Sequence, residues 1–194
     1  NVSHELKTPI TVILGYAEAL KLNLNTNEKN KYCQIIINES KRMNNMVCDI
    51  LDIAKLQSDN INLNIETISV KNIVKNLLEK YLLLFKEKNI DCELICKEDF
   101  ILKADKSKIE TVIDNFITNC LRYTTGDNKK VVIEISKEKF SIYNTCQNLN
   151  EKYLKHLWDS FYKVDKARSR KLGGSGIGLY VVKTILDLHG ISYG

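Results

Sequence analysis

The stretch Ser3-His4-Glu5-Leu6-Lys7-Thr8-Pro9 opens a long helical pattern and places a histidine beside a carboxylate. Around it, apolar residues recur three and four positions apart, which is the spacing of a helix with one apolar seam. They are Val2, Leu6, Pro9, Ile13, Tyr16 and Leu20. His4 lies off this seam. We therefore expect a helix over residues 2–22, with His4 facing solvent and Thr8 one turn further on the same side.

A second helical pattern follows a polar break at residues 23–27 and runs over about residues 28–57. Its apolar stripe consists of Tyr32, Ile36, Met43, Met46, Ile50 and Ile53. Two helices joined by a short loop predict an antiparallel hairpin. A lone hairpin cannot cover both stripes. We expect a homodimer that forms a four-helix bundle, and the alternative is cover by the rest of the chain.

Beyond a break at residues 58–60, short alternating strands and helices are expected. The strands fall at 62–69, 90–96, 100–104, 131–136 and 140–143, and the helices at 70–86, 105–123, 151–158 and 175–189. In the helix at 70–86, the residues expected to face inward are Ile73, Val74, Leu77, Leu78, Tyr81 and Leu82. The fold class is therefore α+β: a helical hairpin in residues 1–60 and an α/β sandwich with a mixed sheet in residues 61–194. Both ends look cut, because residue 1 lies inside a helical pattern and residues 190–194 resemble the start of a strand.

Composition excludes several classes of protein. The net charge of +5 comes from 29 basic and 24 acidic residues that are spread along the chain, so a nucleic-acid footprint is disfavoured. No apolar run approaches the roughly 18 residues of a membrane span, and no signal peptide is visible. The six cysteines form no CxxC pair, which indicates buried reduced thiols. We expect a cytoplasmic domain whose parent protein carries membrane segments upstream.

Asp105 is expected to be the N-cap of the helix that runs to Tyr123, and this helix carries a polar stripe beside its apolar face. The stripe consists of Asn115, Asn119, Arg122 and Tyr123. Carboxamide oxygens are neutral hard ligands, and they suit Mg²⁺ when a triphosphate already balances its charge. An arginine one turn on can meet a phosphate oxygen. A solvated polar face is the alternative that this spacing alone leaves open.

The glycine-rich turn Gly173-Gly174-Ser175-Gly176-Ile177-Gly178-Leu179 opens the last expected helix. Glycines let backbone N–H groups approach a phosphate at a helix N-terminus, which favours anions. The basic loop before the turn is expected to act as a lid over bound phosphates, and it contains Lys163, Lys166, Arg168, Arg170 and Lys171. No P-loop pattern occurs, and the turn follows a loop rather than a strand, which excludes a dinucleotide-binding fold. A glycine-rich helix entry without a ligand is the alternative.

The opening stretch has the chemistry of a phosphoryl acceptor. A neutral imidazole is a nucleophile near neutral pH. Glu5 could accept a hydrogen bond from the other ring nitrogen of His4, which fixes the tautomer and raises nucleophilicity. Thr8 could orient a water molecule for the reverse hydrolysis. A serine hydrolase is a poor alternative, because no nucleophile elbow accompanies the histidine.

In combination, the motifs resemble the transmitter region of bacterial sensor histidine kinases of two-component systems. Residues 3–9 resemble the phosphoacceptor box, 115–123 the asparagine box, 158–163 the phenylalanine box and 174–178 the second glycine box. They occur in the family's order along nearly the whole chain. The resemblance implies a dimerisation and phosphotransfer hairpin followed by an ATP-binding sandwich of the kind shared with gyrase and Hsp90.

The resemblance also implies roles for single residues. His4 would be phosphorylated with Glu5 as base, and Thr8 would serve phosphatase activity toward the partner. Asn119 would ligate Mg²⁺. ATP would bind at Asn115, Asn119, Arg122, Tyr123, Asn144, Arg168, Gly174, Gly176, Gly178 and Leu179. The implied partners are a second copy of the chain and a cognate response regulator, whereas nucleic acid is not expected and membrane contact is expected only through upstream segments.

Residues 144–148 depart from the family's first glycine box. Asn144 stands where the family has an adenine-reading Asp, and both glycines are replaced. An Asn carbonyl still accepts a hydrogen bond, but its NH₂ group is a donor where a carboxylate only accepts. The loss of a charge-assisted bond costs about 1 kcal/mol, so we expect weak ATP binding. The alternative is a phosphatase-biased or pseudokinase dimeric scaffold, and a nucleic-acid-binding helical dimer is the least favoured hypothesis.

Overall fold

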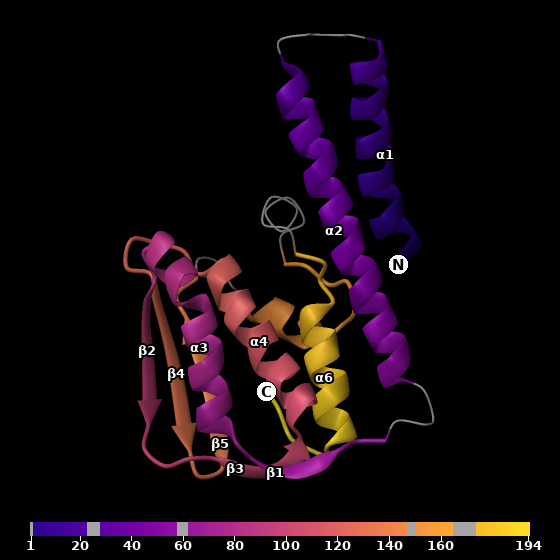
Figure 1. The fold of residues 1–194 in the computed structure, drawn as a ribbon. Coiled ribbons are helices and arrows are strands. Elements are labelled where there is room, and N and C mark those ends of the chain that lie inside the picture. The colour runs from indigo at the N-terminus through magenta and orange to yellow at the C-terminus, as the bar shows by residue number, and fades with distance from the viewer. Residues whose placement is uncertain (1, 23–27, 58–61, 147–149, 165–173) are drawn as a thin grey trace.

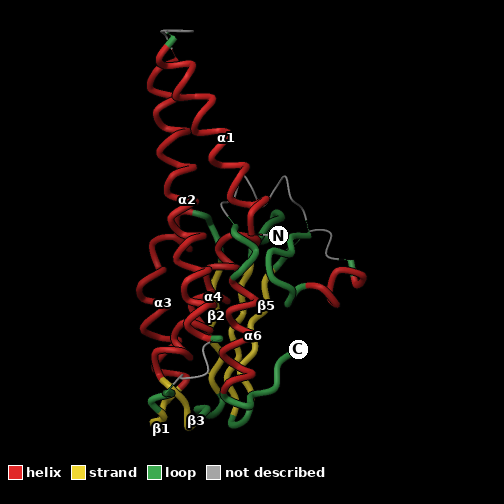
Figure 2. The backbone as a smooth tube through the Cα atoms, turned by 90° about the vertical axis from the view of Figure 1, so that its right-hand side faces the viewer, coloured by secondary structure: helices red, strands yellow, loops and turns green. Residues whose placement is uncertain are grey.

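The computed structural model describes residues 2–22, 28–57, 62–146, 150–164 and 174–194, except for the side chains of Val2 and His4. Two long antiparallel helices, α1 (Val2–Lys21) and α2 (Lys29–Leu56), form a hairpin whose upper half extends clear of the other elements (Figures 1 and 2). An α/β unit lies beside the lower half of α2 (Figure 1). The predicted hairpin is confirmed.

The apolar face predicted for α1 is the face that packs on α2. Pro9 is fully buried, and the helix continues through it. The ring of Tyr16 packs at a tilt against that of Tyr32 of α2, with ring centroids 5.1 Å apart. Within the described residues, no helix is long and apolar enough to cross a membrane.

The α/β unit follows the predicted order of strands and helices. It comprises β1 (Ile65–Ser69), α3 (Val70–Glu87), β2 (Asp91–Cys96), β3 (Ile101–Asp105), α4 (Lys106–Tyr123), β4 (Lys130–Ser136), β5 (Lys139–Asn144), the 3₁₀ helix η2 (Glu151–His156) and α6 (Gly178–Leu188). Residues 191–194 form no strand, contrary to the expectation from the sequence.

The strands form a mixed sheet and a separate pair. β2 is parallel to β4, with Cys92 opposite Val131, and β4 is antiparallel to β5, with Ile133 opposite Ile142. β1 and β3 form a two-stranded antiparallel sheet of their own. The predicted mixed sheet is therefore confirmed, although within the described part of the chain it consists of β2, β4 and β5 alone.

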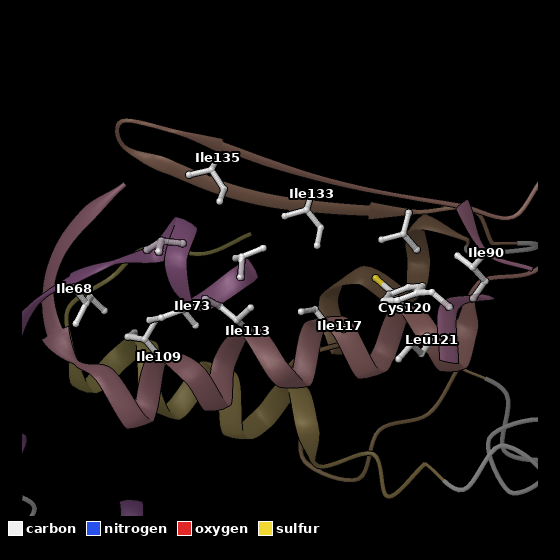
Figure 3. Close-up of a cluster of buried hydrophobic side chains, with 14 of the residues drawn as sticks. Ile68, Ile73, Ile90, Ile109, Ile113, Ile117, Cys120, Leu121, Ile133 and Ile135 are labelled. Atoms are coloured by element: carbon white, nitrogen blue, oxygen red, sulfur yellow. The ribbon is translucent and has the colours of Figure 1, made fainter. Parts of the chain in front are cut away.

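The main core lies between the mixed sheet and α4. Ile133 and Ile135 of β4 face Ile113 and Ile117 of α4, and all are buried (Figure 3). Burial of such side chains contributes about 1.5–3 kcal/mol each, which fixes α4 against the sheet and turns its opposite face toward α6.

Two expectations about burial were wrong. Leu82 of α3 was expected to face inward but is half exposed, because the consecutive apolar residues 81–85 of α3 cover more of the helix circumference than the core can bury. Of the cysteines, Cys33, Cys48 and Cys146 are exposed; all six are free.

A second buried cluster joins the hairpin to the α/β unit. Met46 of α2 is fully buried against α6, together with Leu56. The other buried members are Val112, Ile177, Val181, Val182, Ile185 and Leu186. The α/β unit therefore covers the lower part of the α2 stripe. Higher up, an open groove of about 500 Å³ remains between α1 and α2, lined by Ile10, Ile13, Leu14, Ala17, Ser40 and Met43.

Candidate functional site

The helix that carries the predicted asparagine stripe is anchored at its start by Asp105. The Asp105 carboxylate accepts hydrogen bonds from Ser107 Oγ (2.7 Å) and from the N–H groups of Lys108 (3.2 Å) and Asn64 (3.1 Å). Burial alone would raise the pKa of this carboxyl, but these hydrogen bonds hold the pKa below its ordinary value. The predicted N-cap is confirmed, and it ties α4 to the segment before β1.

The asparagine stripe of α4 abuts the start of α6. Asn115 Nδ2 donates to the Thr111 carbonyl at 2.9 Å, and a Cβ added at Gly178 would lie 2.6 Å from Asn115 Oδ1. Only glycine therefore fits at Gly178 without displacing the amide. Both residues belong to the ATP site expected from the sequence, and the structure brings them into contact.

Further along α4, Asn119, Arg122 and Tyr123 are half-buried. The Asn119 amide makes no hydrogen bond within the described part of the chain. The described residues also contain no group of three His, Cys, Asp or Glu side chains able to hold a metal ion. A neutral amide oxygen fits Mg²⁺ only where other oxygens, such as those of phosphates, complete the coordination.

The glycine-rich turn interlocks with the segment at residues 161–163. The Phe161 N–H donates to the Gly176 carbonyl at 2.8 Å. Gly176 has φ +78°, and a Cβ there would lie 3.0 Å from both the Phe161 carbonyl carbon and the Tyr162 carbonyl oxygen. Gly176 is therefore required by packing and backbone conformation as well as by any approach of phosphate. Gly174 is buried, and Leu179 is half-buried in the first turn of α6.

The turn after β5 is held against the end of α4. The Thr125 N–H donates to the Thr145 carbonyl at 3.0 Å, and Asn144 Nδ2 lies 3.4 Å from the same carbonyl oxygen. Asn144 Oδ1 accepts no hydrogen bond from the described residues, so it keeps the acceptor capacity that the family's Asp would also offer. Asn144 and the asparagine stripe thus lie toward one end of the α/β unit.

Glu5 of α1 faces two cations. Lys163 Nζ donates to Glu5 Oε2 at 2.5 Å, and Arg42 Nη2 of α2 lies 4.0 Å from the same oxygen. The Lys163 side chain is 4% exposed and that of Arg42 9%. Arg42 also pairs with Glu39 at 3.3 Å. Lys163 was expected in an open basic lid; instead it is buried and bridges the α/β unit to α1.

Asp49 of α2 reaches the glycine-rich turn. Ser175 Oγ donates to Asp49 Oδ2 at 2.8 Å. Burial raises the pKa of the Asp49 carboxyl, and the Ser175 hydrogen bond offsets part of that rise. This contact was not predicted from the sequence. The signal that could have indicated it is an acidic residue, Asp49, within the apolar stripe of Met46, Ile50 and Ile53.

Two predicted features lie outside the described residues. The lid residues Lys166, Arg168, Arg170 and Lys171 belong to the undescribed segment 165–173, and the side chain of His4 is also undescribed. The backbone of His4 belongs to α1, next to Glu5. The expectation that His4 faces solvent therefore stays a prediction.

Comparisons with known proteins agree with this organisation. Residues 1–59 match the family described as the His Kinase A (phospho-acceptor) domain, and residues 104–193 match the histidine kinase-, DNA gyrase B- and HSP90-like ATPase family. The sensor histidine kinase WalK of Bacillus subtilis is 32% identical over 98% of this chain, and the sensor protein SrrB of Staphylococcus aureus is 31% identical over 98%. The chain spans about a third of the length of these relatives.

Solved structures show the same fold. The histidine kinase AdeS of Acinetobacter baumannii superposes with a TM-score of 0.72 at 20% identity, over 95% of this chain and 86% of AdeS. A structure of histidine kinase ThkA in complex with the response regulator protein TrrA gives a TM-score of 0.69 at 25% identity, over 84% of this chain and 49% of the ThkA chain.

A phosphoacceptor hairpin followed by an ATPase-type α/β unit defines a two-part transmitter. The chain belongs to the bacterial sensor histidine kinases and contains their transmitter region.

Proposed function

We propose that this chain transfers the γ-phosphoryl group of ATP to His4 and then passes it to an aspartate of a response regulator. The observation that carries the proposal is the contact between Glu5, which follows His4 in α1, and Lys163, which leads into the glycine-rich turn. This contact places the histidine helix against the unit that contains the candidate nucleotide site. The matches to both family descriptions support the same assignment.

The transfer is an in-line displacement. A ring nitrogen of His4 forms a bond to the γ-phosphorus, the bond from that phosphorus to the β–γ bridging oxygen breaks, and ADP leaves. Glu5 accepts the proton from the other ring nitrogen. Mg²⁺, held by Asn119 and phosphate oxygens, would neutralise charge on the phosphates.

ATP binding is supported by the family match at residues 104–193. We assign the nucleotide to the end of the α/β unit where Asn144 lies near the end of α4. The full set of proposed contacts is Asn115, Asn119, Arg122, Tyr123, Asn144, Arg168, Gly174, Gly176, Gly178 and Leu179. Arg122 would meet phosphate oxygens, and Asn144 Oδ1 would accept from the adenine amino group.

The partners follow from the same proposal. The upper groove between α1 and α2 would be covered by a second copy, which completes a four-helix bundle. Residues 1–60 would act as the dimerisation and phosphotransfer unit and residues 61–194 as the ATP-binding unit. Thr8, one turn beyond His4, would orient the water that removes phosphate from the regulator. The parent protein would be anchored in the cell membrane by segments outside this sequence.

Labelling with γ-labelled ATP and Mg²⁺ tests the assignment. The chain should acquire an acid-labile, base-stable label, as a phosphohistidine does, and His4→Gln should lose it entirely. His156→Gln is the matched control, because His156 is exposed and contacts only the nearby Asp159 and Tyr162 among the described residues, and it should label normally. Label that persists in His4→Gln would sink the assignment. No label together with no binding at millimolar ATP would favour the scaffold alternative.

A further inference from the structure

The carboxylate of Asp49 lies where α2 meets the glycine-rich turn. Its oxygen accepts the Ser175 hydroxyl at 2.8 Å, and Ser175 stands between Gly174 and Gly176. The same Ser175 Oγ also lies 3.4 Å from the Ile177 N–H at the start of α6. Asp49 therefore contacts the turn at the helix N-terminus where an anion would be received.

The surroundings of Asp49 on the α/β unit are those of an anion site. Arg122 of α4 attracts its charge, while Asp52 of α2 repels it. A hydroxyl donor and a guanidinium are also the groups that a phosphate oxygen would use. The Asp49 carboxylate thus contacts the turn that the proposed function assigns to the nucleotide phosphates, and the charge of Arg122, which is assigned to the same phosphates, acts on it.

The docking of α2 on α6 does not itself need a carboxylate. Met46 is fully buried at this interface, and Ile50 and Ile53 pack beside it. Placing an ionised side chain in such an interface costs free energy unless its partners compensate fully. An apolar residue at position 49 would dock more favourably. The acid is accordingly better explained by its partners on the turn than by the strength of docking.

We infer that Asp49 is an intramolecular competitor of the nucleotide phosphates, so that docking of α2 on the glycine-rich turn and polyphosphate binding oppose each other. This inference rests on the proposed nucleotide site. In the docked arrangement the Asp49 carboxylate holds Ser175, and an incoming polyphosphate must displace it. Linkage requires the effect to be reciprocal: phosphate binding weakens docking by the same factor by which docking weakens phosphate binding.

The contact between Glu5 and Lys163 extends the consequence to the histidine. While the units are docked, Lys163 and Arg42 occupy the carboxylate that the reaction needs beside His4. Undocking separates Glu5 from Lys163 as well as Asp49 from Ser175, because both contacts join the hairpin to the same unit. Entry of the nucleotide would therefore free the Glu5 carboxylate that accepts the proton of His4, and the α/β unit must then meet α1 again for the transfer itself.

The test compares two substitutions of Asp49 in the 194-residue chain, with a non-hydrolysable ATP analogue and inorganic triphosphate as probes, each with Mg²⁺. Asp49→Ala removes the competitor and should tighten binding of both probes by about fivefold or more in calorimetry. Asp49→Asn keeps an acceptor for Ser175 without a charge to bury, so docking of α2 on the turn persists. Its affinity for both probes should therefore equal or fall below that of the unchanged chain. Asp52→Ala is the control, because it removes an exposed carboxylate from the same helix, and it should change affinity by less than about twofold.

Hydrogen exchange gives a second readout. Addition of triphosphate should reduce the protection of residues 46–56 and 177–186 in the unchanged chain, and Asp49→Ala should show reduced protection without any ligand. Equal affinities in all four proteins would overturn the inference alone. If Asp49→Asn tightens binding of the probes as much as Asp49→Ala does, the negative charge of Asp49 repels the probes at long range without any competition for Ser175. The inference then also fails. Absence of binding by every folded variant would overturn the nucleotide site and the inference together.

Discussion

At Gly178, any side chain larger than a hydrogen atom would have to displace the side-chain amide of Asn115. A methyl group there would lie 2.6 Å from Asn115 Oδ1. Gly178→Ala should therefore lower the free energy of unfolding by about 1–3 kcal/mol, because the amide must leave its position beside α6. Urea denaturation followed by circular dichroism measures the change.

Two further variants make this prediction specific. Gly178→Ala combined with Asn115→Ala should cost less than the sum of the two single changes, since the obstructing oxygen is gone. Gly15→Ala, in exposed α1 with nothing within 4 Å of the added Cβ, should instead stabilise the chain by about 0.5–1 kcal/mol. A strictly additive double variant would contradict the proposed clash.

Single residues were the least predictable part of the site. The sequence indicated Asn115, Gly176 and Gly178 as functional, but their packing contacts join segments far apart in the chain, and no local pattern reveals such contacts. Lys163 was assigned to a lid because a basic run usually lies in solvent. Its burial against Glu5 depends on how the two units dock, which is a tertiary property.

At the scale of elements, α4 depends on its cap. Asp105→Ala removes the acceptor for three donors at the start of the helix and should cost about 1–2 kcal/mol of unfolding free energy. Asp105→Asn retains one acceptor oxygen and should cost less. Because the pKa of Asp105 is depressed in the folded state, its stabilisation is present above the ordinary carboxyl value of about 3.9. The stabilisation is lost as the pH falls through the depressed value.

Urea titrations at several pH values between neutrality and pH 3 check this prediction. The difference in stability between the unchanged chain and Asp105→Asn should be constant near neutrality and shrink below about pH 4. A difference that stays constant down to pH 3 would show that the cap does not depend on the charge of Asp105.

Elements were well predicted because their signals are local. Periodicity gave both hairpin helices, and Asp105 followed by an apolar helical pattern gave the start of α4. The exposure of Leu82 was missed because consecutive leucines are compatible with several helix orientations. The division of the strands into two sheets was also missed, because strand pairing is set by contacts distant in sequence.

At the scale of the whole molecule, the proposed dimer makes a direct prediction. Leu14 of α1 lines the upper groove and is 56% exposed. Leu14→Glu would bury a charge in the proposed bundle and should weaken dimerisation by about 100-fold, as substitutions at central interface positions do. Light scattering coupled to size exclusion, over a range of concentrations, measures the dissociation.

The control for this prediction lies on the α/β unit. Leu83 belongs to α3 and is 72% exposed. Because α3 lies apart from the upper part of the hairpin (Figure 1), Leu83→Glu should leave the dimer intact. A monomeric unchanged chain, or equal dissociation in both variants, would remove the groove from the proposed interface. The sequence raised both a second copy and the α/β unit as cover for the hairpin. The structure assigns the α/β unit to the lower part, which periodicity alone could not decide.

The shared use of α2 has a mechanical consequence. One uninterrupted helix of 28 residues, roughly 40 Å long, lines the upper groove with Met43 and reaches the glycine-rich turn with Asp49. A helix that is hydrogen-bonded throughout transmits torque along its axis. Any rotation of α2 in the upper bundle would therefore turn Asp49 and Met46 relative to α6. The helix can thus transmit a rotation from the upper end of the hairpin to the glycine-rich turn.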